Sequence, residues 1–432
     1  MINIILIFVG KTISKVSKIL NVGSGSTWPG HIALSVNKNF VHEVLKKSKI
    51  KIILIAGTNG KTTTAKLIQT IFENNKKKVF RNESGANLLN GIASSLLLHS
   101  SILSTLDYDY AIFEIDENSL PLALNELEPH TIILMNLFRD QLDRYGEVDS
   151  IAKKWKKALK KLSKETTLIL NADDPQISFL GKNTKALYFG LNEKVRQSKQ
   201  FSADSTYCPN CNSKLAYNTT FFSHLGDWKC NKCSEKRPKL DLEDSPFYPL
   251  PGIYNIYNTH AALLFAKINN INNLTIQQSL RMFTPAFGRQ EIIKAGNKKI
   301  HLFLSKNPTS FNQSLRTVVE LGGNNVLFVL NDRIPDGRDV SWIWDTNLEE
   351  LLDTKQNITV SGDRTYDMAL RIKYASSSKF QISNFKFQIN DKLKNAINES
   401  LEKVQKNETL YVLPTYSAML EVRKILTGKK IL

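Results

Sequence analysis

Short apolar runs recur along the first half of the chain, and stretches with a helical spacing of apolar positions separate them. The runs are four to six residues long and rich in β-branched side chains, which favours strands buried on both faces of a parallel sheet. They lie at residues 52–56, 110–115, 131–135 and 167–170. Helices are expected at 62–75 and 149–164. This alternation predicts right-handed βαβ units, and therefore an α/β fold with a doubly wound parallel sheet.

The same alternation restarts after about residue 290. Strands of a second, smaller α/β domain are expected at 301–304, 326–330, 358–361 and 410–413. The boundary is predicted near Pro285 to Arg289. Residues 201–240 break the rhythm and are expected to be an inserted module. The predicted organisation is a short N-terminal segment (1–45) with a helix from Lys11 to Leu20, a central domain (46–290) and a C-terminal domain (291–432).

Composition narrows the class of protein. With 432 residues, 42% of them hydrophobic, the chain has material for about three domains with real cores. The longest apolar run, Ile2 to Val9, is shorter than the roughly 20 residues that span a bilayer, and it lacks a signal-peptide cleavage pattern. A cytoplasmic protein is therefore expected. The formal charge of +18 permits binding of anionic partners, but lysine runs such as 153–157 lack nucleic-acid recognition signatures, so no nucleic-acid partner is expected.

A candidate phosphate-binding loop follows the first predicted strand. It consists of Gly57, Thr58, Asn59, Gly60, Lys61, Thr62 and Thr63. In such a loop, backbone N–H groups and the start of the next helix hold phosphate. Lys61 would reach the β- and γ-phosphates of a bound nucleotide, and Thr62 would place its hydroxyl on Mg²⁺. An incidental glycine turn is the alternative, and the strand before and helix after the loop argue against it.

Acidic residues end the strand predicted at 110–115. An acid at the carboxyl end of a parallel strand beside a phosphate loop is the expected second ligand of Mg²⁺. Glu114 or Asp116 can serve, because alternation along the strand does not decide between them. Glu114 is the candidate carried forward, and the alternative is that these are solvated acids at the end of a strand.

All four cysteines lie in the inserted module. Cys208 with Cys211 and Cys230 with Cys233 form two Cys-x-x-Cys knuckles that 18 residues separate. This spacing lets four thiolates meet one Zn²⁺, and it predicts a closed structural site. Unmetallated thiols or a redox pair are the alternatives. If all four cysteines hold zinc, the chain keeps no thiol for nucleophilic catalysis.

Several motifs together resemble the Mur ligases, which form amide bonds in peptidoglycan precursors through an acyl phosphate. Besides the phosphate loop, they are residues 113–117, 171–175, 252–258 and 288–289. Within these ligases the chain is most similar to the MurT branch. The similar stretches are 136–147, the cysteine module with 224–226, 306–312, 336–345 and 361–364. The resemblance runs from about residue 16 to residue 432, and it implies a Mur-type central domain with an inserted zinc ribbon.

The resemblance also implies a reaction and a partner. ATP would phosphorylate the α-carboxylate of D-glutamate in the lipid II stem peptide, and ammonia would then displace phosphate to give D-isoglutamine. A GatD-type class I glutaminase with a Cys–His pair would release the ammonia in a heterodimer, and Asp339 would complete its triad. Asp336, Asp345 or a purely structural loop are the alternatives. A lipid-linked substrate would bring the chain to the inner face of the membrane, where its positive charge attracts anionic lipid.

Other assignments rest on the same resemblance. Asn255 and Asn258 match nucleotide-contacting positions of Mur ligases, with structural caps as the alternative. Arg289 would reach the phosphates from the hinge between the central and C-terminal domains. Lys306 and Asn307 match positions where the C-terminal domain faces the cleft.

The chain also departs from the wider Mur pattern. Asp140-Gln141 stands where many Mur ligases have Asp-His, which puts a His-ligated second Mg²⁺ in doubt. Lys153 resembles the carbamylated lysine of the amino-acid ligases only loosely, and it is interpreted as a helix-surface lysine. A Mur-type ligase that adds an amino acid to a peptidoglycan precursor is the competing hypothesis, and the short N-terminal segment argues against it. A zinc-ribbon nucleic-acid ATPase is less favoured, because no base-stacking motif accompanies the ribbon.

Overall fold

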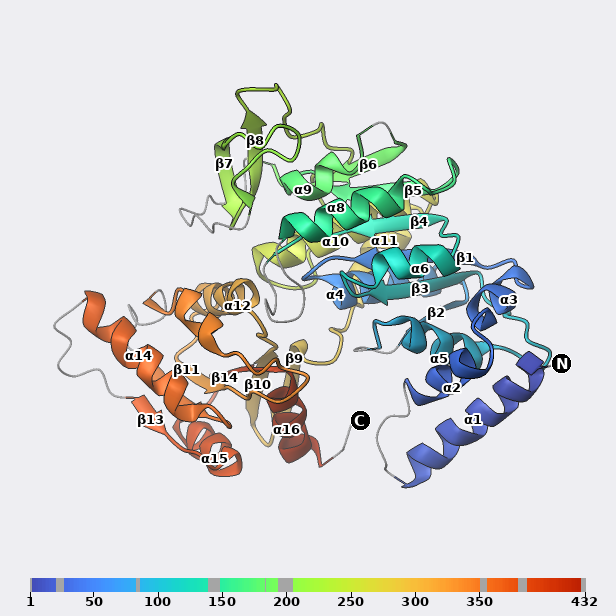
Figure 1. Cartoon of the computed structure of the whole chain (residues 1–432). Coiled ribbons are helices and arrows are strands. Elements are labelled where there is room, and N and C mark those ends of the chain that lie inside the picture. Colours follow the sequence, from blue (N-terminus) through green and yellow to red (C-terminus); the bar gives the residue numbers. More distant parts are fainter. Residues whose placement is uncertain are drawn as a thin grey trace. The chain divides into compact units, whose positions relative to one another are not determined.

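The computed structural model describes residues 2–20, 27–82, 86–138, 148–182, 184–192, 205–349, 356–379 and 387–428. The chain forms two compact units (Figure 1). One contains residues up to 283 except 250–252, and the other contains 250–252 with 284–431. Each unit has its own six-stranded sheet. In the part of the chain that is described, no helix has both the length and the apolar character to span a bilayer.

The sheet of the first unit is entirely parallel, in the order β2-β3-β1-β4-β5-β6. Its strands are β1 (Lys51–Ala56), β2 (Val79–Arg81), β3 (Tyr110–Ile115), β4 (Thr131–Leu134), β5 (Thr167–Asn171) and β6 (Ala186–Phe189). The chain runs from β1 to one side of the sheet and then returns to the other side of β1. Strand order therefore reverses at β1, and ligands of such sheets bind at the carboxyl ends of the strands at this point.

Helices cover both faces of this sheet. On one face lie α4 (Lys61–Asn74), α10 (Ile253–Ile268) and α11 (Asn273–Arg281), where the rings of Phe72 and Phe265 stack with centroids 5.1 Å apart. The other face shares one apolar core with α1 (Ile2–Leu20), α2 (Trp28–Val36), α3 (Phe40–Lys46), α5 (Leu89–His99), α6 (Leu120–Glu126), α8 (Val148–Leu159) and α9 (Pro175–Phe179). Side chains along β1 point alternately to the two faces of the sheet, and Leu54 and Ala56 belong to the apolar core shared with α1 and α5.

The inserted module is an antiparallel hairpin of β7 (Leu215–Phe222) and β8 (Leu225–Cys230). It is attached to the residues that follow β5. The indole of Trp228 donates to Ala172 O at 3.0 Å, and Gly226 N donates to Asp173 O at 3.0 Å. The ribbon is therefore fixed to the carboxyl end of the first sheet.

The second unit has a mixed sheet in the order β13-β12-β11-β14-β10-β9, in which only the described pair β9–β10 is antiparallel. Its strands are β9 (Arg289–Ala295), β10 (Lys298–Phe303), β11 (Asn325–Val329), β12 (Asn357–Ser361), β13 (Phe387–Ile389) and β14 (Thr409–Pro414). Its helices are α12 (Pro308–Glu320), the short 3₁₀ helix η2 (Ser341–Asp345), α14 (Thr365–Lys379), α15 (Leu393–Lys403) and α16 (Tyr416–Thr427). Two apolar clusters form its core.

The structure confirms the predicted α/β class and places a strand at each predicted apolar run. One helix prediction was wrong. The first helix, expected from Lys11, begins at Ile2, because the apolar run 2–9 is its opening half and packs one side on the core. The helix expected at 149–164 ends at Leu159. The division into 1–45, 46–290 and 291–432 stays a prediction.

Candidate functional site

The loop between β1 and α4 requires its glycines. Gly57 and Gly60 have φ angles of +137° and +94°, in the region that side chains disfavour. A Cβ at Gly60 would lie 2.2 Å from Asn258 Oδ1, and one at Gly57 would lie 2.9 Å from the backbone of Asn136. The loop is thus closely packed between β4 and α10, and α4 begins directly after it with Lys61.

The residues after β4 hold this loop in shape. Thr58 N donates to Asn136 O at 2.9 Å, and the hydroxyl of Thr58 accepts a hydrogen bond from Phe138 N at 3.0 Å. The side chain of Asn136 makes two hydrogen bonds with Asn59, accepting from its N–H at 2.9 Å and donating to its carbonyl at 3.1 Å. The sequence analysis included Asn136 only as the first residue of the similar stretch 136–147 and gave it no role in the loop.

Lys61 and Thr62 each meet an acid from the end of β3. The hydroxyl of Thr62 donates to Glu114 Oε2 at 2.5 Å, and Glu114 is fully buried. Lys61 Nζ lies 3.7 Å from a carboxylate oxygen of Glu117, and both side chains are almost fully buried. Lys61 also donates to the carbonyls of Gly57 and Thr58. Sequence reasoning did not assign a role to Glu117.

The structure separates the two acids that the sequence left open. Glu114 faces Thr62 and also accepts a hydrogen bond from Arg81 Nη1 at 3.3 Å. Asp116 instead accepts a hydrogen bond from Asn118 N at 3.2 Å, in the turn after β3. A hydroxyl and a carboxylate side by side are the oxygen ligands that Mg²⁺ prefers, so Thr62 and Glu114 fit that ion.

Helix α10 adds two buried amides to this site. Asn258 Nδ2 donates to Asn255 Oδ1 at 3.0 Å, and Asn258 Oδ1 accepts from the hydroxyl of Thr64 at 3.5 Å. Asn258 thus lies against the start of α4, and it links the loop to Asn255. Thr63, also predicted to bind phosphate, is buried in the first turn of α4.

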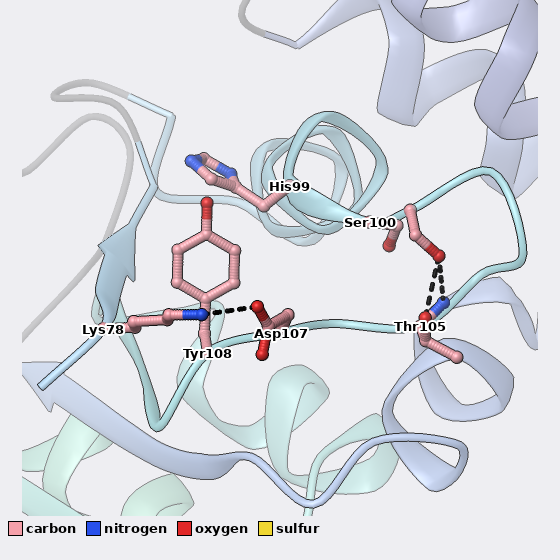
Figure 2. A pocket seen from close by; sticks show the side chains of 7 residues that line it. Lys78, His99, Ser100, Thr105, Asp107 and Tyr108 are labelled. Atoms are coloured by element: carbon pink, nitrogen blue, oxygen red, sulfur yellow. Dashed lines mark hydrogen bonds and ion pairs between the residues drawn. The ribbon is translucent and has the colours of Figure 1, made fainter.

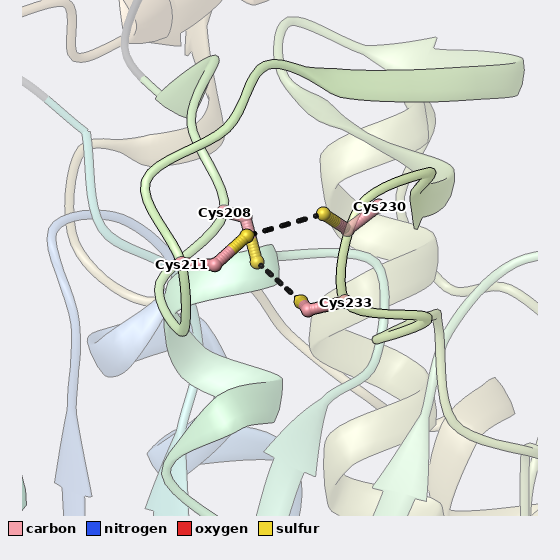
Figure 3. A group of neighbouring side chains, drawn as sticks. All are labelled: Cys208, Cys211, Cys230 and Cys233. Atoms are coloured by element: carbon pink, nitrogen blue, oxygen red, sulfur yellow. Dashed lines mark hydrogen bonds between the residues drawn. The ribbon is translucent and has the colours of Figure 1, made fainter.

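The four cysteine sulfurs form one cluster at the end of the ribbon (Figure 3). The Sγ atoms of Cys208 and Cys233, and those of Cys211 and Cys230, are 3.5 Å apart, and all four lie within 4.8 Å of one another. None of these four cysteines forms a disulfide bond. Tetrahedral Zn²⁺ with Zn–S distances of about 2.3 Å separates its sulfurs by about 3.8 Å, so the cluster fits this ion.

The turn of the ribbon reaches the support of the phosphate loop. His224, buried between β7 and β8, has Nε2 3.4 Å from Asp174 Oδ2, and its ring lies 4.8 Å from that of Phe138. Asp174 accepts from Leu137 N at 2.9 Å and caps α9. Because Phe138 binds Thr58, a continuous chain of contacts joins the ribbon to the phosphate loop.

A buried carboxylate fastens the base of the ribbon. Asp173 is fully buried and accepts hydrogen bonds from Arg237 Nε at 2.6 Å, the hydroxyl of Tyr257 at 2.8 Å and Leu191 N at 2.9 Å. Burial raises the pKa of Asp173 to about 6, and the hydrogen bonds and Arg237 oppose that rise. The same side chain therefore joins β5, the ribbon and α10.

The second unit carries the remaining predicted residues. Asp339 is exposed, accepts from Ser341 N at 2.8 Å, and has its pKa lowered by hydrogen bonds with Ser341. Asp336 is buried and accepts from Ser417 N at 2.7 Å, and burial raises its pKa. Asn307 caps α12 through Ser310 N at 2.8 Å. Arg289, half-buried, begins β9, and Lys306 precedes α12.

Comparison with known proteins places the chain in a family. Residues 55–266 match the Mur ligase middle domain, and residues 304–419 match the MurT ligase C-terminal domain. The chain is 31% identical, over 95% of its own length and 94% of the relative's, to the lipid II isoglutaminyl synthase (glutamine-hydrolyzing) subunit MurT of Streptococcus pneumoniae. It belongs to the MurT family. The subunit of the same name from Staphylococcus aureus is 33% identical, with 81% of this chain and 83% of that one covered.

A solved structure confirms the Mur ligase fold. A pseudomurein peptide ligase type C from Methanothermus fervidus superposes with a TM-score of 0.64 at 20% identity, covering 89% of this chain and 80% of that one. At this identity the likeness concerns the fold alone. Asp140-Gln141, the departure from the wider Mur pattern, lies outside the described residues. Lys153 is exposed on α8, as expected of a surface lysine.

Proposed function

We propose that this chain is the ATP-dependent synthetase subunit of a lipid II isoglutaminyl synthase. Its similarity to MurT subunits of that name over most of both chains supports this reading. The contact of Thr62 with Glu114 beside Lys61, at the strand-order reversal of the first sheet, is the observation that carries it, because ATP and Mg²⁺ would bind through such a set. The proposed domains are 1–45, 46–290 and 291–432.

The first proposed step makes an acyl phosphate. An oxygen of the D-glutamate α-carboxylate attacks the γ-phosphorus of ATP, and the bond between that phosphorus and the ADP oxygen breaks. Lys61 and the N–H groups at the start of α4 stabilise the charge that moves onto the departing oxygen. Asn255 and Asn258 hold the nucleotide beside α4, and Arg289 reaches the phosphates. Mg²⁺ on Thr62 and Glu114 would neutralise phosphate charge and align the reacting groups.

The second proposed step consumes ammonia. Ammonia attacks the acyl carbon, the bond from that carbon to phosphate breaks, and loss of a proton leaves the amide of D-isoglutamine. A class I glutaminase partner of the GatD type would release the ammonia from glutamine. Zinc held by the four cysteines leaves the partner to supply the thiol nucleophile. Asp339, exposed and held ionised by Ser341, would orient the partner's histidine.

An assay with two nitrogen sources tests the proposal. The purified complex with its glutaminase receives ATP, Mg²⁺ and lipid II with either glutamine or ammonium, and isoglutamine is measured by mass spectrometry. Lys61→Ala should lower both activities by at least about 100-fold, because a preorganised cation at the transferring phosphoryl group is lost. Lys66→Ala, on the same helix, is the matched control and should retain both. Retained activity in Lys61→Ala, or incorporation of an amino acid instead of ammonia, would overturn the proposal.

A further inference from the structure

Helix α1 has one face on the protein core and one apolar face exposed to solvent. Leu6, Ile7 and Gly10 are buried on its inner side. On the outer side Ile5 is 61% exposed and Phe8 65% exposed. Four further apolar side chains of the helix are exposed, namely Ile2, Ile4, Val9 and Val16. The outer side of a helix that packs on a globular core is normally polar, so these residues need an explanation.

A second exposed apolar feature lies beside the helix. Lys11 Nζ donates to Ser100 O at 2.5 Å, directly before the loop 101–105. In that loop Ile102 is 62% exposed and Leu103 is 72% exposed. Ile4, Phe8, Lys11 and Lys15 follow one another at helical spacing, so Lys11 brings this stripe next to the loop. We call the exposed apolar residues of α1 and of this neighbouring loop the α1 surface.

The loop is held in a defined shape. The hydroxyls of Ser101 and Thr105 are hydrogen-bonded at 2.7 Å (Figure 2). Leu103 N donates to Ser101 Oγ at 3.2 Å. A hollow of about 400 Å³ opens at the base of the loop, and the ion pair of Lys78 and Asp107 lies on one side of it. The loop therefore presents its two apolar side chains from a backbone of defined shape.

The charge around the α1 surface is positive. Residues 1–42 contain four lysines and no aspartate or glutamate. The first carboxylate, Glu43, accepts hydrogen bonds from the buried Asn3 at 2.7 Å and from Asn37 at 3.1 Å, so it lies toward the inner side of α1. Lys15 is exposed beside the apolar stripe, one turn from Lys11. Apolar side chains flanked by lysines are typical of helices that lie in an anionic membrane interface.

We propose that the α1 surface docks this protein on an anionic phospholipid bilayer. Ile5, Phe8 and Leu103 enter the boundary between headgroups and acyl chains, and Lys15 pairs with lipid phosphates. Exposed apolar side chains beside lysines match the two parts of an anionic bilayer surface, its acyl chains and its phosphate headgroups. Docking deepens the proposed function, because a lipid-linked acceptor would then lie at the same surface as the enzyme.

Vesicle binding tests the proposal without any substrate. The full chain in complex with its glutaminase is mixed with vesicles of phosphatidylcholine, with or without phosphatidylglycerol, and bound protein is measured by sedimentation. Binding should require phosphatidylglycerol and weaken with salt. Ile5→Ser/Phe8→Ser should lower the partition coefficient by about 10-fold or more, because two large apolar side chains no longer insert. Lys15→Glu should lower it as well.

Matched controls keep the outcome specific. Leu274 and Met282 are 72% and 68% exposed at α11, which lies on the opposite face of the sheet. Leu274→Ser/Met282→Ser removes similar apolar surface and should bind vesicles as the wild type does. For Phe8→Trp, which keeps an apolar side chain, brominated phosphatidylcholine mixed with phosphatidylglycerol should quench the added fluorescence. No binding by the wild type, or equal loss in both serine pairs, would overturn the proposal.

Other occupants of the surface give different results. Two results would assign the surface to a protein and overturn the proposal. In both, the wild type does not bind vesicles; it either self-associates through the surface, or it loses its complex with the glutaminase when Ile5→Ser/Phe8→Ser is introduced. The proposed function is tested separately. Lys61→Ala should keep vesicle binding and lose amidation, whereas Ile5→Ser/Phe8→Ser should lose vesicle binding and keep amidation of a detergent-solubilised acceptor.

Discussion

At the scale of single residues, the candidate site depends on acids and amides from strands far apart in sequence. Lys61 and Thr62 are supplied by the loop after β1, while Glu114 and Glu117 come from the end of β3. Asn136 follows β4 and fixes Asn59 through two hydrogen bonds. The neighbours of β1 in the sheet are β3 and β4, so the order of strands explains why these residues meet.

A pair of substitutions tests the assignment of the Mg²⁺ ligand. Glu114→Gln keeps the shape of the side chain and its contact with Thr62 but removes the charge that would bind the cation. Amidation should fall by about 100-fold, and the Mg²⁺ concentration for half-maximal rate should rise. Asp116→Asn is the matched control, since Asp116 binds the turn after β3 and should leave both values within about twofold. The opposite ranking of the two variants would move the ligand to Asp116.

The sequence named the loop, Glu114, Asn255 and Asn258, but not the contacts through which these groups meet. Gly57 to Thr63 are adjacent in sequence, so one local pattern identified them. The partners of this loop are distant. Asn59 meets Asn136 across 77 residues, and Thr64 meets Asn258 across 194. No local pattern encodes such contacts, and they are fixed only when the sheet and α10 are formed.

At the scale of elements, the structure differs most from the sequence reading where burial is incomplete. Some strands, such as β3 and β5, begin within one residue of the predicted start. Their residues form almost continuously buried runs. In the two six-stranded sheets, the strands that were not predicted are β2, β6, β9 and β13, which are the edge strands and carry partly exposed residues. An edge strand needs no continuous apolar run, so hydrophobic periodicity carries little signal for it.

The ribbon is the element whose effect on the site is most directly testable. Cys230→Ser removes one thiolate of the cluster, and zinc measured by mass spectrometry should fall from one per chain to a small fraction of that. The loss should propagate through His224 and Phe138 to the phosphate loop. The melting temperature should fall by at least about 5 °C, and the KM for ATP should rise.

The control for the ribbon lies in the same knuckle region. Asn210 is exposed between Cys208 and Cys211, and Asn210→Ala should keep zinc, melting temperature and the KM for ATP. A zinc-free Cys230→Ser protein with unchanged melting temperature and nucleotide affinity would show that the contacts of His224 with Asp174 and Phe138 do not support the loop.

At the scale of the whole molecule, the residues proposed to bind ATP and the residue proposed to serve the glutaminase partner belong to different units. The phosphate loop lies in the first unit, and Asp339 lies in the second, each beside its own sheet and core. Asp339 and Asp345 are exposed around η2, whereas Asp336 is buried against Ser417. An exposed carboxylate is available to another chain, and a buried one bound by Ser417 serves its own fold.

Nitrogen-source dependence distinguishes these carboxylates. In the complex, Asp339→Asn should lower glutamine-dependent amidation by at least about 100-fold, because the partner's histidine loses the carboxylate that orients it. Ammonium-dependent amidation should stay within about twofold, since that route bypasses the glutaminase. Asp345→Asn should preserve both activities. An equal fall with both nitrogen sources would rule out a role for Asp339 across the interface.

The contact between α4 and α10 has a consequence for folding during synthesis on the ribosome. Asn258 reaches Thr64 across 194 residues, and Phe265 stacks on Phe72. At translation speeds of roughly 5 to 20 residues per second, α10 is made roughly 10 to 40 s after α4. Throughout that interval the side of α4 that packs on α10 stays exposed. The nascent chain therefore passes through a stage in which this apolar surface is accessible to chaperones and the phosphate loop is still incomplete.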